Sequence, residues 1–139
     1  MATLTSTITE AVTINGKALG NTITNSVTSV NNVYQTVLSI KTASAVNIIS
    51  FGSSGSEAMG TVDDGDLKYI RVTNLDSANF VSLTFNVGSD ASKLKLAAGD
   101  SFVYFLDQVD AGGGSIAQID SIRAQADTAE CNVEVFIGY

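Results

Sequence analysis

The chain has 139 residues, a size that suits one ordinary domain with its own hydrophobic core. Apolar residues make up 45% and charged residues 15%, and a formal net charge of -7 repels phosphates, so we expect no nucleic-acid partner. Histidine is absent, which excludes Ser-His-Asp and Cys-His catalysis, and no stretch approaches the about 20 apolar residues that span a bilayer, so we expect no membrane partner.

The start of the chain alternates hydroxyl and apolar side chains. Threonine occupies every second place, at Thr3, Thr5, Thr7 and Thr9. Leu4 and Ile8 stand in places between the threonines. Because successive side chains of a strand point to opposite faces, residues 3–14 are predicted to form a strand with a neutral hydroxyl face and a thin apolar face. The Asn15-Gly16 step that follows is a strong signal for a two-residue hairpin turn.

Alternating apolar residues predict further strands along the rest of the chain. The clearest strand lies at 79–87, where Val81, Leu83 and Phe85 share one face and Ser82 lies on the other. Strand patterns also occur at 33–42, 45–52, 66–74, 92–96, 101–106 and 130–139. Asn, Asp and Gly separate most of these segments, as expected of turns.

The segment 115–129 is ambiguous between helix and strand. Ile116, Ile119 and Ile122 recur at every third residue, which a short helix would explain. Ile122 and Ala124 also fit the two-residue period of a strand. We favour a strand that is entered through an irregular loop.

Together these segments give eight to ten short strands without intervening amphipathic helices. This pattern is typical of an all-β fold rather than an α/β fold. We therefore predict a single antiparallel β-sandwich domain over residues 1–139, jelly-roll-like or immunoglobulin-like in topology. Residues 1–14 are predicted to be an edge strand or a strand that contacts a partner.

An acidic turn offers the one candidate for a metal site. The sequence TVDDGD places Asp63, Asp64 and Asp66 around Gly65. Carboxylate oxygens at this density suit calcium, but the turn lacks the full spacing and the terminal bidentate glutamate of a calcium loop. Since aspartate and glycine are also ordinary turn residues, we prefer the turn and keep calcium as the alternative.

The lone cysteine is predicted to be structural. Cys131 alternates with Val133 and Val135, so it is expected to point into the core as a small apolar residue rather than to serve as a reactive thiol. One cysteine cannot form an internal disulfide, so nothing in the cysteine content requires an oxidising compartment.

Three segments resemble small all-β virion proteins of tailed bacteriophages, particularly the phages of marine bacteria. They are MATLTSTITEAVTINGK at the start, YIRVTNLDSANFVSLTF in the middle, and LAAGDSFVYF, which is followed by the closing ADTAECNVEVFIGY. Proteins of this group are associated with particle structure, as capsid decoration (cement) proteins or as tail and fibre components. The matching segments are strand and turn patterns, so the resemblance assigns no functional residue.

The resemblance implies a non-enzymatic structural role without a cofactor. A decoration protein would bind the major capsid protein and further copies of itself, as a trimer or another homo-oligomer. It would be made in the cytoplasm of the host bacterium and would end on the capsid surface of the virion. A tail or fibre component is the main alternative, and a carbohydrate-binding β-sandwich module is a second.

A virion surface protein gives the opening threonine row a possible purpose. The neutral hydroxyl face of Thr3, Thr5, Thr7 and Thr9 would lie against the capsid shell or a neighbouring copy, since an edge strand has unpaired backbone groups. The alternative is that residues 3–14 only pair at the edge of their own sheet.

Overall fold

Strands account for all the regular structure of the part of the chain that is described. The computed structural model describes residues 1–52, 61–63, 67–105 and 119–139. These residues contain thirteen strands and no helix, so the predicted all-β class is confirmed. Contacts along the chain divide it into two compact units, residues 1–31 and residues 32–139.

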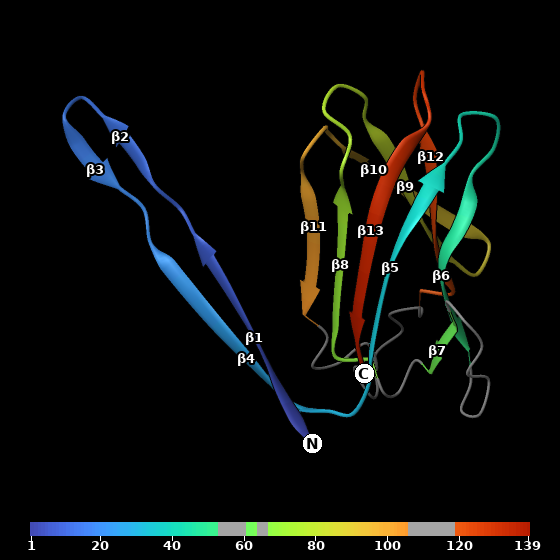
Figure 1. Ribbon diagram of the computed structural model, residues 1–139, viewed down its shortest axis with the longest axis horizontal. Helices are drawn as coiled ribbons and strands as arrows, with labels where there is room; N and C mark the ends of the chain where they lie inside the picture. Colours follow the sequence, from blue (N-terminus) through green and yellow to red (C-terminus); the bar gives the residue numbers. More distant parts are fainter. Residues whose placement is uncertain (53–60, 64–66, 106–118) are drawn as a thin grey trace. The chain divides into compact units, whose positions relative to one another are not determined.

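The first unit is a long β-hairpin. Its strands are β1 (Ala2–Thr9), β2 (Val12–Ile14), β3 (Lys17–Leu19) and β4 (Thr22–Val30). β1 pairs with β4 and β2 pairs with β3, both antiparallel, and the register is the same in both pairs from Leu4↔Val27 to Ile14↔Lys17. Asn15 and Gly16 have φ angles of 51° and 77°, as a type I′ turn requires, so the predicted turn is confirmed. Figure 1 shows the two arms running side by side to this turn.

The second unit contains the two sheets of a β-sandwich. Its strands are β5 (Val33–Ile40), β6 (Val46–Gly52), β7 (Thr61–Asp63), β8 (Tyr69–Asn74), β9 (Val81–Val87), β10 (Asp90–Leu96), β11 (Ser101–Phe105), β12 (Ser121–Ala126) and β13 (Cys131–Gly138). One sheet has the order β10-β9-β12-β6-β7 and the other has the order β11-β8-β13-β5. The two sheets form two layers in Figure 1. Every pairing is antiparallel except that of β6 with β7, which is parallel.

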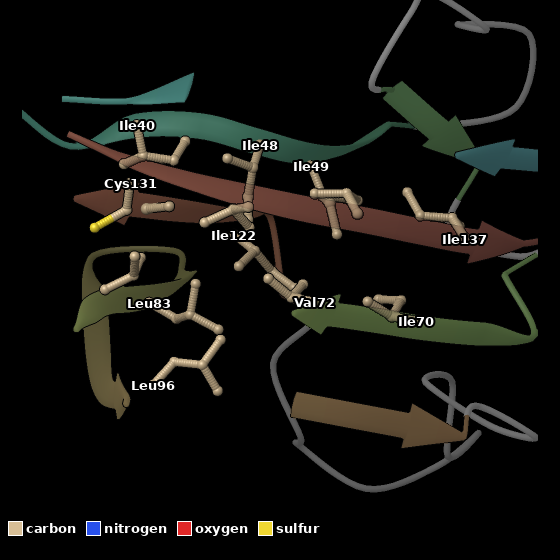
Figure 2. Close-up of a cluster of buried hydrophobic side chains, with 14 of the residues drawn as sticks. Ile40, Ile48, Ile49, Ile70, Val72, Leu83, Leu96, Ile122, Cys131 and Ile137 are labelled. Atoms are coloured by element: carbon tan, nitrogen blue, oxygen red, sulfur yellow. The ribbon is translucent and has the colours of Figure 1, made fainter. Parts of the chain in front are cut away.

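The core of the second unit is built from the inward-facing residues of both sheets. On β13, Cys131, Val133, Val135 and Ile137 are at most 1% exposed, as the alternation in the sequence predicted. Figure 2 shows how side chains from the two sheets meet, among them Ile40, Val72, Leu83 and Ile122. Burial of such side chains stabilises the fold by about 1.5–3 kcal/mol each before conformational entropy is subtracted.

The predicted strands and the observed strands agree closely in the second unit. The segments 79–87 and 130–139 contain β9 and β13. In the ambiguous segment 115–129, residues 121–126 form strand β12, and Ile122 and Ala124 of this strand are buried. The strand interpretation is therefore confirmed for residues 121–126. Residues 115–118 lie outside the described residues.

The single domain over residues 1–139 stays a prediction, and the strands of the two units have different partners. The nine strands of residues 32–139 that are described make both sheets of the sandwich, whereas residues 1–31 pair only with one another. The physical reason is the turn at Asn15-Gly16, which returns the chain directly onto β1 and so satisfies its backbone locally.

Candidate functional site

The predicted contact residues lie on one strand of the N-terminal hairpin, which is the name we use for residues 1–31. Thr3, Thr5, Thr7 and Thr9 are all exposed and all belong to β1. Strand β1 pairs with β4 in a two-stranded sheet, so it is not an edge strand of either sandwich sheet.

The hydroxyl face is two strands wide. The register sets Thr7 opposite Thr24 and Thr9 opposite Thr22, and their Oγ1 atoms are 3.4 Å and 3.3 Å apart. Thr5 faces Ser26 in the same row. The β4 hydroxyls were not among the predicted contact residues. The Asn15-Gly16 turn could have identified them, because a two-residue turn determines which residues of the two arms face each other.

The opposite face of the hairpin alternates apolar and polar pairs. Three of its cross-strand pairs are apolar: Leu4 with Val27, Ile8 with Ile23, and Val12 with Leu19. The polar pair of Ser6 and Asn25 lies between the first two, and Glu10 and Asn21 lie between the last two. The four residues of the pairs Ile8–Ile23 and Val12–Leu19 are between 41% and 50% exposed, and Leu4 and Val27 are half-buried. A thin apolar row was expected on β1, and the return strand places a second one beside it.

The N-terminal hairpin differs in charge from the rest of the chain. Glu10 and Lys17 are its only charged side chains and they cancel, so the formal net charge of -7 resides in residues 32–139. A neutral surface costs less to desolvate than a charged one. The desolvation of charged side chains would therefore cost less at the hairpin than at the rest of the chain.

The outer face of the four-stranded sheet contains a second cluster of polar and aromatic groups. Arg71 Nη2 lies 2.7 Å from Glu134 Oε2, and Gln35 Nε2 donates a hydrogen bond of 2.7 Å to Glu134 Oε1. The guanidinium also lies 5.8 Å from the ring centroid of Phe136. The hydrogen bond from Gln35, and then that from Arg71, lowers the pKa of Glu134. Since its oxygens are already bonded and its pKa is lowered, Glu134 is a weak proton acceptor and is not suited to be a general base.

The aromatic rings beside this cluster pack against each other. The ring of Tyr69 lies 5.2 Å from that of Phe105 and 5.9 Å from that of Phe136, in edge-to-face geometry. Tyr69 is only 5% exposed, so its ring does not offer an open platform on which a sugar could stack. This argues against a carbohydrate site at this position.

The candidate metal residues fall mostly outside the described residues. Asp63 ends β7, while Asp64 and Asp66 lie in the range that is not described, so the structure does not bring the three together or separate them. Within the described ranges, no three Asp, Glu, Cys or His side chains form a group that could hold a metal ion. Calcium binding by this turn stays an alternative prediction.

Cys131 has the environment that its sequence pattern predicted. The side chain is 1% exposed and belongs to the hydrophobic core. Burial, followed by the charges of Asp76 and Asp127, raises the pKa of its thiol. Because the thiolate is the reactive form, a raised pKa makes this thiol inert near neutral pH.

Comparisons with known proteins add no assignment to this geometry. No family model, no curated protein and no solved structure matches the chain. In the described residues, no helix has the length and apolar character needed to cross a bilayer.

Proposed function

We propose that this chain is a structural protein of a tailed-bacteriophage virion, which decorates the outer surface of the major capsid shell and stabilises it. The observation that carries the proposal is the N-terminal hairpin, a separate neutral unit with an exposed hydroxyl face, which accompanies an acidic sandwich. The resemblance described for residues 1–17, 69–85, 96–105 and 126–139 supports this class of protein as a proposal.

In this proposal the hydroxyl face of the hairpin lies on the shell. Hydroxyl groups both donate and accept hydrogen bonds, so Thr5, Thr7 and Thr9 suit a polar, uncharged surface of the capsid protein. The contact would be repeated at every copy on the shell. A protein that binds only the assembled shell opposes its opening by mass action, which is the physical basis of a cement.

The acidic sandwich fits the outside of a particle. Its net negative charge keeps decorated particles apart in solution and gives it no affinity for the packaged nucleic acid. The hydrophobic core between the stacked sheets supplies a stable body. These properties would suit a tail or fibre component as well, which remains the alternative.

The decisive experiment is a density map of the intact particle. We expect density for this chain on the outer surface of the major capsid protein, with the hydroxyl face of the hairpin in contact with the shell. Density confined to the tail would contradict decoration and favour the alternative, and particles that lack the chain altogether would contradict both.

A binding assay tests the contact residues directly. Thr7→Lys introduces a charge into the middle of the hydroxyl face and should weaken binding of the purified protein to shells that lack it. Asn132→Lys makes the same charge change at an exposed position of the sandwich and should bind like wild type. Equal binding by both variants would exclude the hydroxyl face as the contact, and equal heat resistance of bare and decorated shells would exclude cementing.

A further inference from the structure

Strand β5 is an edge strand without the usual protection against pairing with another chain. Four strands, β10, β7, β11 and β5, stand at the ends of the two sandwich sheets. β10 carries Asp90, Lys93 and Lys95, while β7 has three residues and β11 has five. Charged side chains and short length are common means of keeping a sheet edge from pairing. β5 has eight residues, no charge and no proline, and its register with β13 is unbroken, so it has neither form of protection.

The register with β13 determines which backbone groups of β5 point to its open edge. Asn32 and Tyr139 exchange two backbone hydrogen bonds, of 2.7 and 3.0 Å. Because hydrogen-bonded and non-hydrogen-bonded pairs alternate in an antiparallel ladder, the even-numbered residues of β5 bond to β13. The odd-numbered residues direct their N–H and C=O groups to the other side, where no strand of the described part of the chain pairs with β5. These outward-facing residues are Val33, Gln35, Val37 and Ser39.

This open edge specifies the kind of occupant that fits it. A row of N–H and C=O groups at strand spacing is satisfied by another extended strand, which adds to the sheet. The side chains of β5 are neutral on both faces. Val33 and Val37 are 54% and 55% exposed on one face, and Tyr34 and Leu38 lie half-buried against the core on the other. The strand that fits this edge is therefore uncharged and has apolar side chains on both of its faces.

A second copy of β5 is such a strand, and its backbone can pair with all four outward-facing residues. Two β5 strands that run antiparallel about a two-fold axis at Thr36 pair Val33 with Ser39 of the partner subunit. The same register pairs Gln35 with Val37 of the partner subunit. Each of these pairs exchanges two backbone hydrogen bonds, so none of the outward-facing groups of either strand is left without a partner.

The side chains are compatible with this two-fold pairing. Thr36 lies opposite Thr36 of the partner subunit, and Tyr34 lies opposite Leu38 of the partner subunit, so the second pair extends the half-buried apolar surface across the axis. On the other face, Val37 lies diagonally next to Val37 of the partner subunit. No charged residue belongs to the paired stretch, and salt screens the repulsion between the acidic remainders of the two copies beyond about 8 Å.

We propose that β5 pairs antiparallel with β5 of a second copy of the chain, which joins the two four-stranded sheets into one continuous sheet across a two-fold axis. The inference concerns the protein alone in solution and does not rest on the proposed capsid role.

The test compares oligomeric states of the full chain by size-exclusion chromatography with light scattering over a dilution series. The wild type should reach twice the chain mass of 14.4 kDa as concentration rises. Val37→Pro removes an N–H group that points to the open edge and leaves the hydrogen bonds between β5 and β13 in place. Because the change occurs in both copies, it should raise the dissociation constant of the dimer by about tenfold or more.

The matched control changes the same residue without removing the N–H group. Val37→Ile retains a β-branched apolar side chain at this exposed position, so it should dissociate like wild type. Circular dichroism checks that each variant is folded. If Val37→Pro does not fold, Val37→Lys replaces it, since two like charges would then lie diagonally across the axis. A wild type that is monomeric at every concentration measured would overturn the proposal, and so would a folded Val37→Pro or Val37→Lys variant that associates as strongly as wild type.

Hydrogen exchange on the wild type locates the contact residue by residue. The amides of the even-numbered residues of β5 should exchange slowly at every concentration, because they bond to β13. The amides of the odd-numbered residues should exchange slowly only where the dimer forms. Fast exchange of these amides in the dimer would place the contact elsewhere, and slow exchange of them in the monomer would mean that the chain covers its own edge. Either result would overturn the proposal.

Discussion

Arg71 on β8 and Glu134 on β13 form an ion pair of 2.7 Å between Nη2 and Oε2 on the outer face of the four-stranded sheet. Their side chains are 28% and 19% exposed, so the pair is shielded from water only in part. Gln35 on β5 binds the second carboxylate oxygen. The carboxylate therefore links three neighbouring strands of the sheet, β8, β13 and β5.

We expect this carboxylate to make the protein less stable in acid. Its pKa is lowered in the folded state from the ordinary value of 4.5, so its contribution is complete above that value and is lost as pH falls through the lower, folded-state pKa. The free energy of unfolding of the wild type should decrease from about pH 5 towards about pH 3, and that of Glu134→Gln should decrease less. Chemical denaturation at a series of pH values measures both.

A control for the acid effect is Asp90→Asn, at an exposed position on β10. Its pH dependence should follow that of wild type. If Glu134→Gln loses as much stability in acid as wild type does, the carboxylate is not responsible for the effect.

A second prediction concerns the buried amide of Asn74, which is fully buried at the end of β8. Its Nδ2 donates to the carbonyl oxygens of Asn79, Leu96 and Ala97 at 2.8, 3.2 and 3.1 Å, and its Oδ1 accepts from the Asp76 amide at 3.1 Å. Asn74→Ala leaves these backbone groups without their partner. It should destabilise the sandwich by about 2–4 kcal/mol, measured by denaturant unfolding.

The matched control for Asn74 is Asn132→Ala, at an exposed asparagine on β13. This change should alter the free energy of unfolding by about 0.5 kcal/mol or less. Similar losses from the two substitutions would contradict the role assigned to Asn74.

The thiol of Cys131 should be almost inert in the folded protein. The side chain is 1% exposed, so a reagent can hardly reach the sulfur atom. Burial also raises the pKa of the thiol, so little of it is in the reactive thiolate form. Labelling with a thiol reagent near neutral pH should be slow without denaturant and fast in it. Rapid labelling of the native chain, with the circular dichroism spectrum unchanged, would contradict the buried position.

Gly20 should be essential for the continuous hairpin. Its φ angle is +144°, and a Cβ atom at this position would collide with the backbone oxygen of Glu10. Gly20→Ala should therefore distort the junction between β3 and β4 and make the amides of the hairpin exchange faster with solvent. Ala18→Ser, an exposed change on β3, is the control and should leave hydrogen exchange of the hairpin amides as in wild type.

The sequence predicted those parts of the fold that depend on local alternation. Val81 and Leu83 on β9 are buried, as the two-residue period required, and the type I′ turn occurs at Asn15-Gly16. Both features are decided by neighbouring residues, through strand geometry and through the φ angles that Asn and Gly tolerate.

Other features could not be derived from local pattern. The amide of Asn74 is satisfied because the carbonyl groups of residues 79, 96 and 97 lie around it in the folded protein. Nothing in the sequence near position 74 indicates that these three carbonyl groups come together. The parallel pairing of β6 with β7 was not predicted either, because alternation identifies a strand without giving its direction. The separate hairpin was missed although its signal was present, since the turn at Asn15-Gly16 implied the pairing of Thr7 with Thr24.

The position of β13 has a consequence for the synthesis of the protein. This strand lies between β5 and β8, so that Cys131 faces Ile40 and Val135 pairs with both Thr36 and Val72. The two earlier strands cannot form this sheet without it, and they leave the ribosome long before it does. Folding of the sheet therefore waits for β13 to emerge, and until then the unpaired edges of the earlier strands are exposed to aggregation.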